Sequence, residues 1–276
     1  MKHFSKLILS TSLVFGLNSA NAAELPTANG YTKIQDGKGV DLYSTTSNDV
    51  FIQVVDLQNG GGVGLDAHSG IYNSSKKTYY RKTIDDLFNE FYSSKLFGLV
   101  NGQFFNHDKK FTTISFPIKG SWHELKTHND EESKRSLYIY PSTNTALIKD
   151  NYDANYMIDT GVSDLIVGLN PDVKKSSGYA IGRSYIGGYS ADCNSSDKEC
   201  SYTHLLFMTA ANKTQAQMES IAQNWGVTPE ALIMMDGSGS AQAKTSQHHL
   251  YGSSVPIYNN EEQRKLPHVI ALYEDL

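Results

Sequence analysis

The stretch Ala231-Leu-Ile-Met-Met-Asp-Gly-Ser-Gly-Ser240 carries the strongest structural signal of the chain. Its first five residues are apolar, as is typical of a short buried strand. The carboxylate of Asp236 follows, and then the loop Gly237-Ser-Gly-Ser240, whose glycines free the backbone to turn. Successive N–H groups and hydroxyls in such a loop can point at one anion. The alternative reading of the same residues is an ordinary Asp-Gly turn.

A helix is predicted directly before this strand. Thr214 followed by Gln217 forms the capping-box pattern, and apolar residues from Met218 to Trp225 recur at helical spacing. Gly226 stands where the left-handed residue that ends a helix is expected. The sequence therefore predicts a helix followed by a buried strand and a polar loop.

A second unit of the same kind lies earlier in the chain. A helix is predicted over residues 83–95 and a buried strand over 97–100, before the polar run Asn101-Gly-Gln-Phe-Phe105. Asn101 can both donate to and accept from a sugar hydroxyl, whereas the two phenylalanines are more simply core residues. If the strands of the two units were parallel neighbours, both loops would meet at one sheet edge.

The remaining pattern predicts one domain of many short strands. Strand-like runs are expected at residues 50–57, 111–118, 136–140, 146–148 and 164–169, and a solvated loop at 124–135. The polar residues 23–50 are expected as a lead-in to a single domain over 51–276. We expect an α+β fold with a mixed, largely antiparallel sheet and a few helices.

The N-terminus predicts export. Lys2 and Lys6 precede a short apolar run at residues 7–17, and Ala20-Asn-Ala22 supplies a cleavage site. Residues 1–22 are therefore expected to be a signal peptide, and the alternative is an uncleaved membrane anchor. The mature chain is expected to be periplasmic or secreted. Loss of the two lysines changes the formal charge from −5 to −7, which disfavours nucleic-acid and anionic-membrane partners. No later segment is long and apolar enough for membrane insertion.

The two cysteines, Cys193 and Cys200, are close together in a polar segment. In an oxidising compartment this spacing favours a local disulfide over a catalytic thiol. The pair His248-His249 has no third ligand at useful spacing, so neither a metal nor a cofactor is predicted.

One arginine has a setting suited to phosphate. Arg183 lies among glycines in Ile181-Gly-Arg-Ser-Tyr-Ile-Gly-Gly188, where a guanidinium could clamp a phosphate with two hydrogen bonds. Taken alone, the same arginine could equally cover a surface.

The runs beginning at Asn101, Arg183 and Asp236, in this order, resemble the phosphodiester glycosidase family, which includes the enzymes that uncover mannose 6-phosphate. The resemblance spans about residues 51–273, including a closing run at Arg264. Gln103 and Ser238 stand where the family has glycine, and Ser184 where it has threonine. The resemblance implies an exported hydrolase of sugar-1-phosphodiesters acting on a phosphorylated glycan. Its alternative is a non-catalytic glycan-binding or inhibitory protein on the same fold.

The chemistry of such a reaction assigns roles to these residues. A phosphate monoester leaves readily, so the site needs cations and backbone donors for phosphate more than a strong general acid. One carboxylate would activate water or stabilise an oxocarbenium-like centre, whereas attack at phosphorus would need a metal or a nucleophile. The predicted catalytic residues are Asp236, Asn101 (orienting the sugar), Arg183 (holding the phosphate) and Asp159 as a second carboxylate. The predicted substrate-binding residues are Gln103, Ser184, Gly237, Ser238, Gly239 and Ser240.

Overall fold

The computed structural model describes residue 25 and residues 28–276, except for 107–109, 120–123, 126–132, 152–160, 194–199 and 254–263. The expected signal peptide and Asp159 both lie outside the described residues. Within the described part, none of the helices has the length and apolar character needed to span a bilayer.

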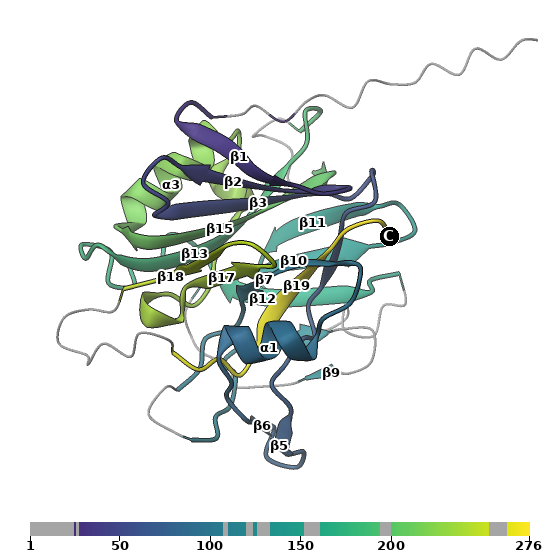
Figure 1. Cartoon of the computed structure of the whole chain (residues 1–276), viewed down its shortest axis with the longest axis vertical. Coiled ribbons are helices and arrows are strands. Elements are labelled where there is room, and N and C mark those ends of the chain that lie inside the picture. Colours follow the sequence, from purple (N-terminus) through teal and green to yellow (C-terminus); the bar gives the residue numbers. More distant parts are fainter. Residues whose placement is uncertain are drawn as a thin grey trace, which may run out of the picture.

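Most of the described strands belong to two antiparallel sheets (Figure 1). The larger sheet has 12 described strands, and the path across it follows an order far from that of the sequence. Along this path lie β1 (Tyr31–Asp36), β2 (Val40–Thr45), β3 (Val50–Asp56), β15 (His204–Lys213), β13 (Ile181–Tyr189), β16 (Leu232–Met234), β12 (Asp164–Leu169), β10 (Lys134–Tyr140), β11 (Thr145–Asp150) and β14 (Ser201–Tyr202). Off this path, β8 (Ile118–Lys119) pairs with β12, and β9 (Glu124–Leu125) pairs with β8.

The smaller sheet has five described strands. In order across the sheet they are β18 (His249–Tyr251), β17 (Gln242–Thr245), β7 (Leu96–Asn101), β19 (Val269–Tyr273) and β4 (Gly62–Gly64). A separate pair, β5 (Ile71–Asn73) and β6 (Thr78–Tyr79), projects from the body of the molecule (Figure 1).

Two α-helices among the described residues cover the sheets, and their N-termini form as the sequence predicts. α1 (Ile84–Glu90) is capped by the Thr83 hydroxyl and ends earlier than residue 95. α3 (Gln215–Asn224) begins with the predicted capping box of Thr214 and Gln217, and Gly226 after it has a φ of 77°. Short 3₁₀ turns, η1 (Pro229–Ala231) and η2 (Ser238–Ser240), flank β16.

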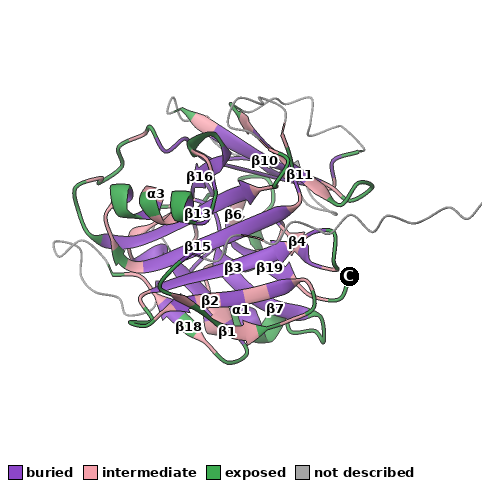
Figure 2. Ribbon diagram, turned by 90° about the horizontal axis from the view of Figure 1, so that it is seen from above, coloured by how far each residue is buried: buried purple, intermediate pink, exposed green. Residues whose placement is uncertain are grey.

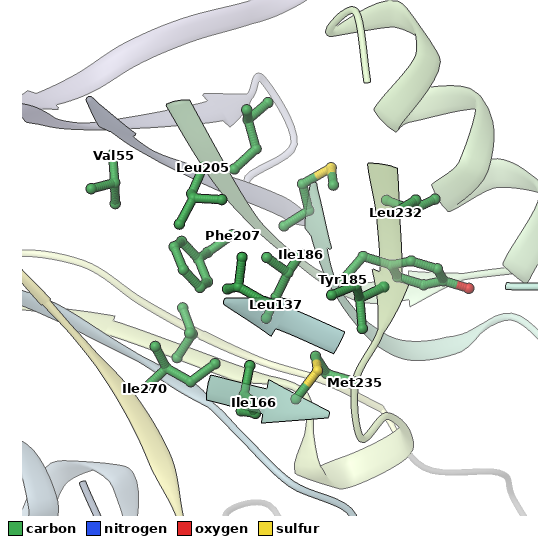
Figure 3. Close-up of a cluster of buried hydrophobic side chains, with 14 of the residues drawn as sticks. Val55, Leu137, Ile166, Tyr185, Ile186, Leu205, Phe207, Leu232, Met235 and Ile270 are labelled. Carbon is green, nitrogen blue, oxygen red and sulfur yellow. The ribbon is translucent and has the colours of Figure 1, made fainter. Parts of the chain in front are cut away.

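The elements form four layers: α1, the smaller sheet, the larger sheet and α3 (Figure 1). Alternation along a strand divides the apolar residues between layers, so that Leu99 of β7 faces α1 while Val100 faces the other sheet. Between the sheets lies the main core, where Figure 3 shows Phe207, Ile166 and Ile270 from three different strands. Figure 2 shows buried residues running along β3, β15 and β13, with exposed residues on the outer side of α3.

Three expectations need correction. The fold is mostly β rather than balanced α+β, because the strands greatly outnumber the two described helices. β7 and β16 belong to different sheets, so the assumption that they are parallel neighbours is wrong. Residues 111–118 do not form one strand; among the described residues this run has isolated bridges at Thr112 and Ile114, and β8 begins only at its end.

The expected lead-in at residues 23–50 contains two strands of the larger sheet. β1 and β2 pair with each other, and β2 pairs with β3. Tyr31 and Tyr43 from these strands approach Trp225 edge to face, at centroid distances of 5.4 and 5.0 Å. The disulfide between Cys193 and Cys200 is present, as predicted.

Candidate active site

The ends of β7 and β16 meet although the two strands lie in different sheets. The Asn101 side chain, 2% exposed, donates through Nδ2 to the main-chain oxygen of Asp236 at 2.7 Å. Its Oδ1 accepts from the backbone N–H of Gln242 at 3.1 Å and from the Ser184 hydroxyl. One buried amide thus joins the end of β7, the start of β17, β13 and the loop that begins at Asp236. A catalytic carboxylate requires a fixed arrangement of this kind.

Asp236 has the environment of a group that exchanges protons near neutral pH. Its Oδ1 accepts from the Gly237 N–H at 2.9 Å, and a second hydrogen bond comes from the side chain of Ser240. Burial raises the pKa of Asp236 to about 6, although these hydrogen bonds and the nearby positive charge of Arg264 act in the opposite direction. A carboxyl group with this pKa can change protonation state during a reaction.

The loop after Asp236 turns at a serine rather than at its glycines. Ser238 has a φ of 57°, a left-handed conformation, while neither Gly237 nor Gly239 has a positive φ. Gly182 of β13 packs closely against this turn, because an added Cβ there would lie 2.0 Å from the Ser238 oxygen. Ser238 therefore carries a strained backbone held by its neighbours, as is frequent at functional sites.

A pocket of about 170 Å³ opens beside Asp236. We call it the Asp236 pocket. It contains three cationic side chains, one carboxylate and one aromatic ring. Lys175 Nζ lies 5.5 Å from the centre of the Phe104 ring. The lining residues are Phe104, Lys175, Ser176, Ile181, Arg183, Met234, Met235, Asp236, Gly237, Ser238 and Arg264. The excess of positive charge suits an anionic ligand.

The donors of Arg183 are directed at main-chain oxygens. Its Nη1 donates to the Lys175 carbonyl at 2.9 Å, and its Nη2 to those of Ser176 and Tyr179 at 2.5 and 3.1 Å. Nε donates to the Lys213 carbonyl at 3.3 Å, and burial lowers the pKa of the guanidinium. The arginine therefore fixes the loop that carries Lys175 and contributes positive charge to the pocket.

Other predicted site residues lie behind the pocket wall. Gln103 is buried, donates through Nε2 to the Val167 carbonyl at 2.6 Å, and through its backbone N–H to His268 Nδ1 at 3.2 Å. The Ser240 hydroxyl accepts from Arg264 Nη1 at 3.2 Å. The described lining contains neither these two residues nor Asn101, Ser184 and Gly239. Their contacts instead position the residues that do line the pocket.

Solved structures provide the comparison for this geometry. The fold is similar to that of a glycosidase catalytic domain. The zebrafish N-acetylglucosamine-1-phosphodiester alpha-N-acetylglucosaminidase catalytic domain, auto-inhibited by its pro-peptide, superposes with a TM-score of 0.56 at 13% identity. This alignment covers 89% of the present chain and 82% of the zebrafish chain. A Burkholderia pseudomallei protein described as exported gives a TM-score of 0.47 at 8% identity, covering 84% and 74% of the two chains.

These identities establish a relationship of fold alone. No family model matches the chain, and no curated protein matches it either. Roles for individual residues must therefore be argued from the contacts in this structure.

Three of the charged and aromatic lining residues were not among the predicted site residues. Lys175 lies in a polar, lysine-containing run that is typical of a surface loop, and Phe104 fits a core position equally well. Arg264 belongs to the closing run of the family resemblance, but nothing local in that run indicates a ligand. Only the tertiary structure brings these three side chains to Asp236.

Proposed function

We propose that this protein is an exported hydrolase that cleaves the glycosidic bond of sugar-1-phosphodiesters in a glycan or glycoconjugate. Its products are a free sugar and a phosphomonoester. The observation that carries the proposal is the Asp236 carboxyl, with a pKa raised to about 6, inside a pocket with three cations. The fold relationship to a phosphodiester glycosidase domain supports a hydrolase of this class.

The phosphate is the part of the substrate that these cations recognise. Lys175 and Arg264 line the pocket with Arg183, and together they outnumber the single carboxylate. Positive charge fixed in advance stabilises the negative charge that develops on the leaving phosphate oxygen. Arg183 donates to four carbonyls, so its proposed part is to support the loop that carries Lys175. Lys175 and Arg264 are proposed to contact the phosphate directly.

Asp236 acts at the anomeric carbon. Bond cleavage takes place between C1 and the phosphate oxygen, which leaves with both electrons, while water supplies the new C1–O bond. The Asp236 carboxylate either accepts a proton from that water or stabilises positive charge on the sugar ring. Asn101 binds the main-chain oxygen of Asp236, so its proposed part is to orient this carboxylate. Asp159 stays a prediction as a second carboxylate.

Product analysis tests the proposal. The purified mature chain is incubated with a panel of sugar-1-phosphodiesters, and the products are identified by mass spectrometry. We expect free sugar from the wild type, no turnover from Asp236→Asn, and full activity from the control Asp192→Asn, because Asp192 is exposed. Sugar 1-phosphate as the product would show attack at phosphorus instead. Binding without turnover in the wild type would support the non-catalytic alternative.

The proposed export has its own test. Disulfides persist in oxidising compartments, and the Cys193–Cys200 bond agrees with such a location. N-terminal sequencing of the protein recovered from cells should find Ala23 as the first residue. An N-terminus at Met1 in a membrane fraction would show an uncleaved anchor.

A further inference from the structure

A second and larger pocket, of about 540 Å³, lies next to the Asp236 pocket. We call it the Glu219 pocket. The loop at residues 174–178 separates the two, because Lys175 and Ser176 line the first pocket while Lys174, Ser177 and Gly178 line the second. The lining residues are Arg135, Asn170, Pro171, Asp172, Lys174, Ser177, Gly178, Gln215, Ala216, Glu219, Gln223, Val227, Pro229, Glu230 and Leu232.

Both pockets lie on the same face of the larger sheet. Leu232 lines the Glu219 pocket and Met234 lines the Asp236 pocket, and residues two apart on a strand point to the same side. Met234 pairs with Tyr185 of β13, and the next residue on that face of β13 is Arg183, which lines the Asp236 pocket. α3 forms the outer wall of the Glu219 pocket through Gln215, Ala216, Glu219 and Gln223. The two pockets are therefore neighbours along β16, on one face of the sheet.

The Asp236 pocket is too small for a whole glycoconjugate. Its volume of about 170 Å³ is below the range of roughly 300–1,000 Å³ that is usual for ligand sites, whereas the Glu219 pocket is within that range. A phosphodiester held beside Asp236 must thus extend outside this small pocket. The Glu219 pocket is the neighbouring cavity large enough for the extension.

The charge of the Glu219 pocket disfavours a second phosphate. Its lining carries the carboxylates of Asp172, Glu219 and Glu230 against two cations. One of those cations, Arg135, already binds Asp150 through Nε and Nη2 and donates through Nη1 to two carbonyls of the chain around β16. Carboxylates accept hydrogen bonds from hydroxyl groups and repel phosphate.

Gln215 supplies an unused acceptor at this pocket. The residue is 5% exposed, and its Nε2 donates to the Pro171 carbonyl and to Glu219. Its Oε1 is buried and accepts no hydrogen bond from the described residues. A buried acceptor of this kind costs free energy unless a ligand or water donates to it. Rotation of the Gln215 side chain towards the pocket would bring this acceptor to a sugar hydroxyl.

We infer that the Glu219 pocket binds a neutral sugar unit of the glycan next to the scissile phosphodiester. The inference rests on the proposed function for the nature of the whole substrate. Its carboxylate and amide acceptors bind sugar hydroxyls, while Val227 and Leu232 offer apolar surface to the ring. The loop at residues 174–178 sets the spacing between the sugar and the phosphate.

Binding of neutral disaccharides tests the inference without any need for catalysis. Cellobiose, maltose and chitobiose are titrated, one at a time, into the full mature Asp236→Asn protein, and binding is followed by protein NMR. We expect shifts at α3 and at residues 170–178 for at least one disaccharide. Ala216→Trp fills the pocket from an exposed site on α3 and should weaken this binding at least about tenfold.

Ser220→Trp is the matched control. Ser220 is exposed on the same helix and does not line the Glu219 pocket, so the same large side chain there should leave disaccharide binding unchanged. Absence of shifts for all three sugars at about 50 mM, or equal weakening by both tryptophans, would overturn the inference.

A failed hydrolysis assay can be told apart from a failed sugar site. If the wild type cleaves no sugar-1-phosphodiester but disaccharides still bind at α3, the proposed reaction is wrong and the sugar site stands. Where cleavage does occur, KM of Ala216→Trp is compared with that of the wild type for a substrate with a disaccharide and for one with a single sugar. If KM is unchanged for both substrates, the proposed sugar site is wrong. Inorganic phosphate should shift residues of the Asp236 pocket only, and shifts at the Glu219 pocket would contradict its proposed charge preference.

Discussion

The Asp236 pocket and the Glu219 pocket share one face of one sheet but have opposite electrostatic character. Three cations and one carboxylate line the first, whereas three carboxylates and two cations line the second. The difference arises along a single loop, in which Lys174 and Lys175 are neighbours in the sequence but line different pockets. A short loop across a sheet can therefore divide a uniform β surface into two sites with different ligand preferences.

The two pockets also show that a buried arginine can donate to main-chain carbonyls and hold the chain in place, in addition to any contact with a ligand. Arg183 donates to carbonyls of residues 175, 176, 179 and 213, and Arg135 donates to carbonyls of residues 229 and 232. Each arginine thereby fixes main chain at the edge of its own pocket. Planar guanidinium groups with five donors are suited to this task, and lysine is not.

Replacement of the carboxylate in the Asp236 pocket should have the largest effect. We expect Asp236→Asn to lower kcat by about 10³-fold or more, because the water or the charged sugar ring loses its partner. The measurement is single-turnover cleavage of a sugar-1-phosphodiester. An amide keeps the acceptor for the Gly237 N–H, so a folded protein is expected, and near wild-type turnover would refute the catalytic role.

The stability of the same variant separates catalysis from folding. The pKa of Asp236 is raised in the folded protein, so the stability it contributes is greatest below pH 4 and falls as the pH rises towards 6. Asp236→Asn removes this cost, and its Tm at pH 7 should equal or exceed that of the wild type. A marked decrease in Tm would show that the carboxylate stabilises the fold.

The pH dependence of the wild type should follow the titration of Asp236. If the ionised form is active, kcat/KM falls below a pH of about 6, by about tenfold per pH unit. Rates measured between pH 4 and 8 with one phosphodiester test this. A kcat/KM that stays constant down to pH 4 would exclude Asp236 as the titrating group, because its protonation near pH 6 would then have no effect on the rate.

Arg183→Lys should distinguish positioning from direct phosphate binding. A lysine keeps the positive charge but cannot donate to four separate carbonyls, so residues 175–179 lose their support. We expect kcat/KM to fall about 10- to 100-fold, with faster amide exchange in residues 175–179 and a lower Tm. If the affinity for phosphate fell while amide exchange in residues 175–179 stayed unchanged, the result would instead show that Arg183 contacts the phosphate directly. A matched control, Lys244→Arg, changes a cation on the smaller sheet that lines neither pocket.

Part of this arrangement follows from local sequence. The capping box at Thr214, the left-handed Gly226 and the strand before Asp236 each depend on neighbouring residues, and each forms as predicted. By contrast, no local sequence pattern predicted the central strand β15. It is buried along most of its length, so it lacks the apolar-polar alternation that identifies a half-buried strand.

The candidate site depends on contacts between residues far apart in the chain. Asn101 and Asp236 are predicted as site residues, but their hydrogen bond joins two sheets whose pairing local patterns do not specify. Lys175 and Arg264 have no local feature that separates them from surface cations, and only the tertiary structure brings them to Asp236. Local chemistry therefore indicates the carboxylate, while long-range packing determines which cations accompany it.

The adjacent lysines of the loop at residues 174–178 give the smallest expected effect and the sharpest test of the difference between the pockets. Lys175→Ala should raise KM for a sugar-1-phosphodiester about tenfold, equivalent to about 1.4 kcal/mol, because a cation near the phosphate is lost. Lys174→Ala removes the same charge from the Glu219 pocket and should change KM less than about twofold. The reason is that this pocket is proposed to bind a neutral sugar and not the phosphate. Steady-state kinetics at low ionic strength compare the two variants. Equal effects would mean that the loop acts through its overall charge, and the division of the sheet face into a phosphate site and a sugar site would then fail.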